Sequence, residues 1–315
     1  MKKKVIFLSV LFTVIVLGFV PFFSQNKTTL IKASFFNTYK QLDNAGNWEN
    51  WRPDLKKIYL ADSNKISIKK DTNAFTIHYG DNRISVKLAD ALFNVEEQTD
   101  NKTIHYRYSI EPDKIGRKTI LTVYRNTNAI NYVIGKFREP SFSETHLTDF
   151  KNFMETDSLR YGYKIFKTKV PENNLIVIKK IVPAANKFAE AAKTLAVLQQ
   201  YIKANNLKQT QPVIAQFIPK GKDSSQVNVG LFIDREVPST GNIIFTRMPK
   251  GGPLYAARYN GRFNKRQRAY IGLQQYFTDH LYQSAILPFE TYLDDKLPSS
   301  DTDRIKIQVN FTTYF

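Results

Sequence analysis

The C-terminal half of this 315-residue chain contains one pattern of segments twice, and this internal repeat constrains the fold more than any other feature. Hydrophobic periodicity predicts, in both copies, a strand, an amphipathic helix and two further strands. The first copy covers residues 175–182, 186–204, 213–218 and 227–233. The second copy covers residues 254–259, 265–283, 288–293 and 304–311. Pro212 and Pro288 open corresponding strands, so the two units stand in tandem.

Each predicted helix has one apolar face and therefore covers one side of a sheet. The helix over 186–204 carries Phe188, Leu195 and Leu198 on that face, and the helix over 265–283 carries Leu273 and Phe277. Two such units can join their edges into one curved sheet. We expect a groove between the repeats on the concave face opposite the helices, where ligands are favoured.

The C-terminal half resembles the GyrI-like, AraC-type effector-binding domain over about residues 160–315, and the motifs that carry the resemblance lie in the second copy. The resemblance rests on four short motifs in a specific order: Gly252-Pro253-Leu254-Tyr255, Arg258-Tyr259-Asn260-Gly261, the helix with Tyr270 and Phe277, and Pro288-Phe289-Glu290-Thr291-Tyr292. Asn260 stands where the family usually has His. The resemblance implies a fold of two βαββ units and a pocket for small ligands.

Glu290 is the main candidate site residue. Strand alternation places Tyr292 on the same face as Glu290 and Phe289 on the opposite face. The matching position in the first repeat is Ile214, so the repeated architecture does not require a carboxylate. In the family, the equivalent Glu lies in an aromatic pocket and receives cationic or polar ligands. A partly desolvated carboxylate beside aromatic rings attracts lipophilic cations.

The predicted ligand-binding residues are therefore Glu290 and Tyr292, with Tyr255 and Tyr259 lining the same groove. Alternatively, Glu290 is an exposed edge-strand residue that pairs with a lysine, and the two other tyrosines are ordinary strand aromatics. Some GyrI-like proteins are hydrolases. That resemblance offers a second function, in which Glu290 is a general acid or base assisted by Tyr292 or Tyr255. A third is an envelope interaction protein without a small ligand. We favour the binding module over an enzyme and keep a small-molecule hydrolase as the alternative.

The segment 28–159 predicts a separate α+β domain. A strand over 30–33 and a helix over 35–42 precede strands at 66–70, 74–79, 84–88, 103–110, 119–124 and 130–137. Ser141 and Glu144 fit a capping box that begins a C-terminal helix. Ile31-Lys32-Ala33-Ser34, Tyr39, Leu42 and the Trp48/Trp51/Pro53 cluster resemble the START-like, or SRPBCC, helix-grip family. The resemblance implies an apolar cavity, although we expect both tryptophans to be packed in the core.

The N-terminus predicts a membrane anchor over residues 1–24. Lysines 2–4 precede an apolar run over 5–23, which as a helix approaches the thickness of a bilayer core. The lysines should stay cytoplasmic. The expected protein is thus a bacterial single-pass inner-membrane protein with both domains on the periplasmic side. A cleaved signal peptide is the alternative, but the run ends without an A-x-A-like site.

The remaining composition excludes several classes of function. The chain has no cysteine and only four histidines, which lack metal-ligand spacing, so we expect no metal and no cofactor. The net charge of +18 is spread along the sequence. Its densest cluster, Arg262, Lys265, Arg266 and Arg268, looks exposed and lacks interleaved aromatic residues. We expect a solvated surface there, and no nucleic-acid partner.

Overall fold

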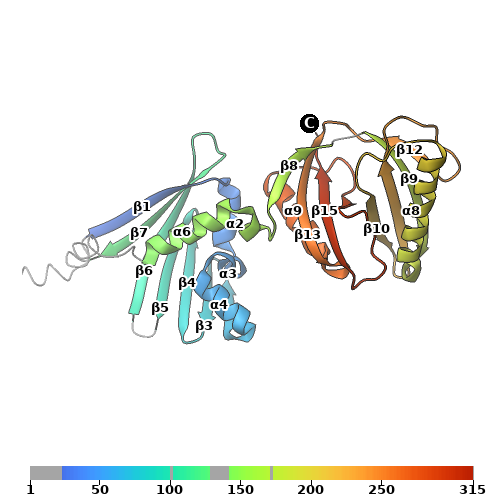
Figure 1. Ribbon diagram of the computed structural model, residues 1–315. Helices are drawn as coiled ribbons and strands as arrows, with labels where there is room; N and C mark the ends of the chain where they lie inside the picture. Colours follow the sequence, from blue (N-terminus) through green and yellow to red (C-terminus); the bar gives the residue numbers. More distant parts are fainter. Residues whose placement is uncertain (1–22, 100–101, 128–141, 171–172, 315) are drawn as a thin grey trace, which may run out of the picture. The chain divides into compact units, whose positions relative to one another are not determined.

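The structure is a computed structural model that describes residues 23–99, 102–127, 142–170 and 173–314. The chain divides into two compact units, Met1–Arg160 and Tyr161–Phe315. Each unit combines helices with one antiparallel sheet (Figure 1), so the predicted α+β class is confirmed.

The N-terminal unit is built on a seven-stranded antiparallel sheet. Its strands alternate between buried and exposed residues, as on β4, where Ile84 and Val86 are buried and Lys87 is exposed. Across the sheet the strands are β1 (Phe23–Ile31), β7 (Thr119–Thr127), β6 (Lys102–Pro112), β5 (Leu92–Thr99), β4 (Asn82–Ala89), β3 (Ala74–Tyr79) and β2 (Ile66–Asp71).

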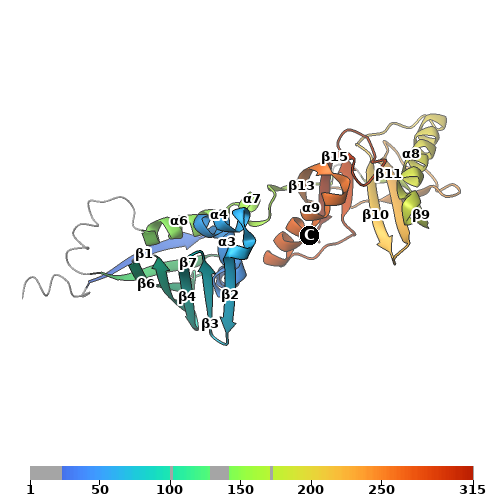
Figure 2. The ribbon, with the colours of Figure 1, turned by 90° about the horizontal axis from the view of Figure 1, so that it is seen from below.

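One face of this sheet is covered by helices (Figure 2). They are α2 (Phe35–Asp43), α3 (Trp48–Trp51), α4 (Pro53–Ala61) and α6 (Phe142–Glu155), followed by the short α7 (Asp157–Arg160). The Ser34 side chain caps α2 by accepting a hydrogen bond from the Asn37 backbone N–H. Trp48 and Trp51 are buried and pack against each other with tilted rings, and Trp51 also packs on Phe150 of α6. Both tryptophans are therefore core residues, as predicted.

A buried charge cluster occupies the space between this sheet and its helices. The guanidinium of Arg52 binds both carboxylate oxygens of Glu97, at 2.7 and 3.1 Å, and also contacts Asp54. The hydroxyls of Tyr79 and Tyr106 each donate to Glu97 at 3.0 Å. The core between this sheet and its helices therefore contains a polar network among its buried apolar residues.

The C-terminal unit is built on an eight-stranded antiparallel sheet in which the order strand–helix–strand–strand occurs twice. The two copies meet where β10 pairs with β14. Across the sheet the strands are β12 (Ile244–Arg247), β9 (Asn174–Pro183), β11 (Ser224–Phe232), β10 (Ile214–Lys220), β14 (Phe289–Tyr292), β15 (Arg304–Thr312), β13 (Pro253–Arg262) and β8 (Ile165–Lys169).

Both long helices of this unit, α8 (Lys187–Ala204) and α9 (Gln267–Asp279), pack on the same face of the sheet (Figures 1 and 2). They also end alike. Asn206 and Leu281 adopt a left-handed backbone with φ of 49° and 57°. The following N–H bonds the carbonyl five residues back, from Leu207 to Ile202 and from Tyr282 to Phe277. This cap ends α9 at Asp279, four residues before the predicted position.

Several predictions fall outside the described residues. They are the strand over 130–137, the Ser141/Glu144 capping box and nearly all of the anchor over 1–24. Within the ranges that the structure does describe, none of the helices is both long and apolar enough to span a membrane.

Leu281 offers a test of the helix cap, because a residue with a Cβ is strained in the left-handed conformation. Its side chain is 91% exposed, so its replacement removes little packing. We predict that Leu281→Gly raises the free energy of unfolding by about 0.5–1 kcal/mol. This is the net effect, because the strain that glycine relieves is partly offset by the entropy that it adds to the unfolded chain. Urea unfolding measures this. Leu281→Ala, which keeps the Cβ, should change little, and an equal gain in both variants would contradict the prediction.

The charge cluster predicts a pH dependence through His146 on α6. Burial, and then the positive charge of Arg52, lower the pKa of this side chain to about 3. An unfolded histidine takes up its proton near pH 6.5, so below that pH the unfolded state binds more protons and stability falls until the folded pKa is reached. Between pH 6 and 4, we predict that the free energy of unfolding of the wild type falls more steeply than that of His146→Gln. The difference is about 1.4 kcal/mol for each pH unit. Parallel curves of unfolding free energy against pH would contradict this.

Candidate functional site

Glu290 lies on β14, at the junction of the two repeats. Its backbone partners are Ala215 on β10 and Val309 on β15. The register thus pairs the carboxylate-bearing position with Ala215 of the first repeat, and not with Ile214. Glu290 is fully buried. A buried carboxylate of this kind must be neutralised by its surroundings.

The carboxylate lies on the helix-covered face of the sheet, which corrects the expected position in a groove opposite the helices. Tyr270 of α9 donates a hydrogen bond to Glu290, and Tyr292 does the same from β14. Phe289, the residue before, lines a pocket on the opposite, open face. Alternation places Glu290 with Tyr292, but it does not tell which of the two faces the helices cover.

Three donors satisfy both oxygens of Glu290. Oε1 accepts a hydrogen bond from Arg266 Nε at 2.5 Å and one from the Tyr270 hydroxyl at 2.9 Å. Oε2 accepts a hydrogen bond from the Tyr292 hydroxyl at 2.5 Å. Hydrogen bonds to an ionised group are short and strong, so this set holds the carboxylate in one orientation.

Both tyrosines are held in the protonated, donating form. Burial, followed by the negative charge of Glu290 and the hydrogen bond to it, raises the pKa of Tyr270 far above its ordinary value. The same causes, in the same order, raise the pKa of Tyr292. The two hydroxyls therefore act as neutral hydrogen-bond donors at any physiological pH.

Arg266 supplies the positive charge, from the turn between β13 and α9. Its guanidinium lies 3.5 Å from the ring centroid of Phe263 and 6.0 Å from that of Phe217. Its Nη1 donates to the Phe263 backbone carbonyl at 3.2 Å. The Arg266 side chain is 15% exposed, whereas that of Glu290 is 1% exposed. The cation is thus the member of the pair that reaches solvent.

The other two predicted residues, Tyr255 and Tyr259, share the helix-covered face with Glu290 but make other contacts. Tyr255 packs on the rings of Tyr276, Phe277 and Tyr282. The Tyr259 hydroxyl donates to the Arg262 carbonyl at 2.6 Å. The structure therefore brings Tyr292 to Glu290, while the described contacts of Tyr255 and Tyr259 lie elsewhere.

Two residues of the site, Arg266 and Tyr270, were not predicted. Arg266 belongs to the basic cluster that was interpreted as solvated, and Tyr270 was named only in the helix motif of the family resemblance, without a role in the site. One signal was available, because Tyr270 falls on the sheet-facing side of α9 and needs a partner for its hydroxyl. The pairing of Arg266 with a residue 24 positions later has no comparable local signal.

The open face of the same sheet has a pocket of about 320 Å³. Its floor is apolar and includes Leu175, Val177, Ile214 and Phe289. Lys179 and Arg247 also line it. This is the groove expected opposite the helices. It lacks a buried charge, so it suits an amphipathic molecule.

The N-terminal unit has its own buried carboxylate, Glu97, but this one is sealed. Its cation, Arg52, is 0% exposed and binds both carboxylate oxygens. A ligand would have to disrupt the core to reach it. Breaking such a fully buried pair is strongly destabilising, so this cluster is suited to a structural role.

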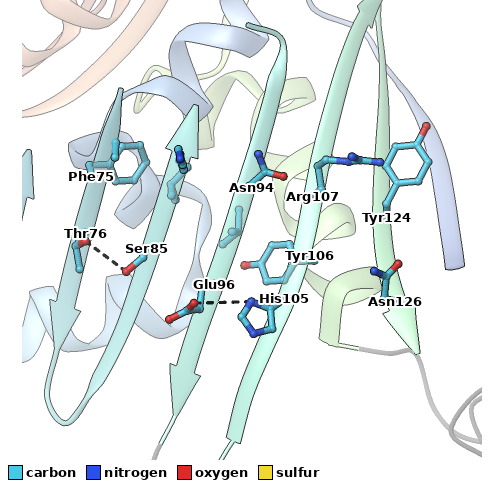
Figure 3. Close-up of a pocket in the computed structure, with 14 residues that line it drawn as sticks. Phe75, Thr76, Ser85, Asn94, Glu96, His105, Tyr106, Arg107, Tyr124 and Asn126 are labelled. Carbon is cyan, nitrogen blue, oxygen red and sulfur yellow. Dashed lines mark hydrogen bonds and ion pairs between the residues drawn. The ribbon is translucent and has the colours of Figure 1, made fainter. Parts of the chain in front are cut away.

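The outer face of the N-terminal sheet is hollowed into an open pocket of about 490 Å³ (Figure 3). Figure 3 shows Thr76, Ser85, Glu96 and His105 side by side on neighbouring strands. Glu96 contacts His105 at 3.8 Å, and Arg107 lies over the ring of Tyr124. These charged groups are exposed or half-exposed, and exposed ion pairs contribute little. The hollow offers hydrogen bonds but no desolvated charge.

No protein-family model and no curated protein matches this chain. Similar solved structures include the C-terminal domain of EcmrR, which is 22% identical over 48% of this chain and 98% of that one, with a TM-score of 0.40. A hydrolase from Listeria innocua is 12% identical over 48% of this chain and 92% of that one, with a TM-score of 0.35. A START superfamily protein from Mycobacterium smegmatis is 14% identical over 42% of this chain and 97% of that one, with a TM-score of 0.29. These similarities are too distant to assign a function to this chain.

Proposed function

We propose that the C-terminal unit binds a small organic cation at Glu290, as a ligand-binding or sensor module. The observation that carries the proposal is a fully buried carboxylate whose positive partner is partly exposed and stacked on an aromatic ring. Phe217, Phe263, Tyr270 and Tyr292 surround the pair. A carboxylate with aromatic rings is the environment that a lipophilic cation needs.

Folding alone does not account for this arrangement. A buried ion pair is often no more stabilising than well-packed apolar residues of similar volume. The cross-strand partner of Glu290 in the first repeat is the apolar Ala215, so the carboxylate has no polar partner on the neighbouring β10 position. The perturbed groups here are Tyr270 and Tyr292, whose pKa values are raised by burial and by the charge of Glu290, and such perturbed ionisable groups are typical of functional sites.

A hydrolase that uses Glu290 as general acid or base is the alternative. Both oxygens of Glu290 already accept hydrogen bonds, and the side chain is buried. Catalysis would need both a substrate and a water molecule beside this carboxylate. Binding needs only a ligand cation in the place of the Arg266 guanidinium. The geometry therefore supports binding better.

For the cellular location, we propose that residues 1–24 anchor the chain in the inner membrane with both units outside the cytoplasm. The three lysines and the apolar run over 5–23 support this. Protease added to intact spheroplasts should then digest both units. Protection of the two units until the membrane is permeabilised would contradict the proposal.

The Glu290 site can be tested by calorimetric titration of the full chain in detergent with two cations, phenylguanidinium and trimethylphenylammonium. We predict that Glu290→Gln weakens binding of the better one by about 30-fold or more, because losing a buried charge partner costs about 2 kcal/mol or more. Glu236→Gln, which removes an exposed carboxylate paired with Arg247, is the matched control and should not change it. Equal affinities in wild type and Glu290→Gln would refute the proposal.

The open-face pocket supports a second candidate function, the binding of an amphipathic carboxylate. The apolar floor would hold an alkyl chain, and Lys179 and Arg247 would lie near its head group. Decanoate is a suitable probe. Thr246 lines the pocket and is exposed, so Thr246→Trp should fill the space without disturbing the core and abolish decanoate binding. Unchanged decanoate binding in that variant would exclude this site.

A further inference from the structure

The chain itself already places a cation at Glu290. The guanidinium of Arg266 stacks on Phe263, donates from Nε to the carboxylate and donates from Nη1 to a backbone carbonyl. These are the contacts that a bound ligand would make: one ring face, one carboxylate and one neutral acceptor. The contacts of the Arg266 guanidinium therefore indicate which kind of cation fits the site.

We propose that Arg266 is a built-in competitor, and that the external ligand is a planar, delocalised cation with N–H donors on an aromatic or apolar body, such as an aryl guanidine or amidine. This inference rests on the proposed function of Glu290 as a cation site. It adds the chemical class of the ligand and the internal group that the ligand must displace.

The need for N–H donors follows from the acceptors of the site. Glu290 Oε1 and the Phe263 carbonyl both receive an N–H from Arg266. A quaternary ammonium can stack on the ring and neutralise the charge, but it cannot donate to either oxygen. Each oxygen keeps one other donor, the Tyr270 hydroxyl on Oε1 and the Arg266 backbone N–H on the Phe263 carbonyl, so the quaternary ammonium forfeits the charge-assisted hydrogen bonds and leaves neither acceptor unpaired. The site should therefore discriminate between two cations of equal charge that differ in N–H groups.

Displacement of Arg266 is feasible because of where it sits. The residue lies between the 3-10 turn Phe263–Lys265 and the first residue of α9, Gln267, and its side chain already reaches solvent. Replacing one cation by another keeps Glu290 neutralised, and the released guanidinium regains water. Such internal competition lowers the apparent affinity by the fraction of time that the site is free.

The test compares phenylguanidinium with trimethylphenylammonium in titrations of the full chain and of Arg266→Ala. Removing the competitor should tighten phenylguanidinium binding by about tenfold or more. In Arg266→Ala, trimethylphenylammonium should bind about tenfold more weakly than phenylguanidinium, because it lacks donors. Arg268→Ala removes an exposed arginine two residues away and should bind both cations like the wild type.

Stability gives an independent measurement if Arg266→Ala folds poorly. Arg266→Gln keeps most of the stem and a hydrogen-bond donor and serves as the second variant. In either variant, phenylguanidinium should raise the melting temperature more than it does in the wild type, whereas in Arg268→Ala it should not.

The outcomes separate the two proposals. If both cations bind in a Glu290-dependent manner but Arg266→Ala gains no affinity, or if the two cations bind equally well, the inference about Arg266 is wrong and the cation site stands. If neither cation binds any variant in a Glu290-dependent manner, the cation site itself is wrong.

Discussion

A carboxylate that is removed from water needs a positive partner, and in the C-terminal unit this requirement organises the junction of the two repeats. Glu290 lies where β14 pairs with β10, with an apolar residue opposite. Its charge is balanced by Arg266 from the turn before α9, and its lone pairs are used by tyrosines of α9 and β14. The helix α9, the turn before it and the strand pair β10–β14 are thus all linked through the side chain of Glu290.

The two units contain similar polar clusters with different access to solvent. Each cluster has one buried glutamate, one arginine and two tyrosine hydroxyls. In the N-terminal unit Arg52 is fully buried and grips Glu97 with two nitrogens, so the cluster is closed. In the C-terminal unit Arg266 reaches solvent and is held by one nitrogen and a ring. This difference in the arginine makes Glu290 the site at which exchange with a ligand is possible.

Local sequence patterns predicted the regular parts of the fold well. Strict alternation in β4 and β15, and the apolar stripe of α8, marked elements that the structure contains. Several elements were missed, including the short edge strands β8 and β12 of the C-terminal sheet. The strand β5 (Leu92–Thr99) carries Glu96 and the buried Glu97, whose charge breaks the apolar alternation and is tolerated only because Arg52 meets it from elsewhere. The helix α4 (Pro53–Ala61) buries only Leu55, so its pattern is weak.

The site was predicted in part, for a similar reason. Glu290 and Tyr292 were identified because two-residue spacing on a strand is a local property. The face they occupy depends on where the helices pack, and the role of Arg266 depends on a turn that meets β14 across the sheet. Four neighbouring basic residues look alike in sequence, and only the fold shows which of them meets a buried carboxylate.

The central claim is that Arg266 and Glu290 neutralise each other inside the C-terminal unit. A double-mutant cycle on the free energy of unfolding, with Arg266→Gln, Glu290→Gln and the double variant, measures this coupling directly. If the claim holds, the double variant loses less stability than the two single variants together, by about 1–3 kcal/mol. Losses that add to within about 0.5 kcal/mol would show that the two side chains act independently and would contradict the claim.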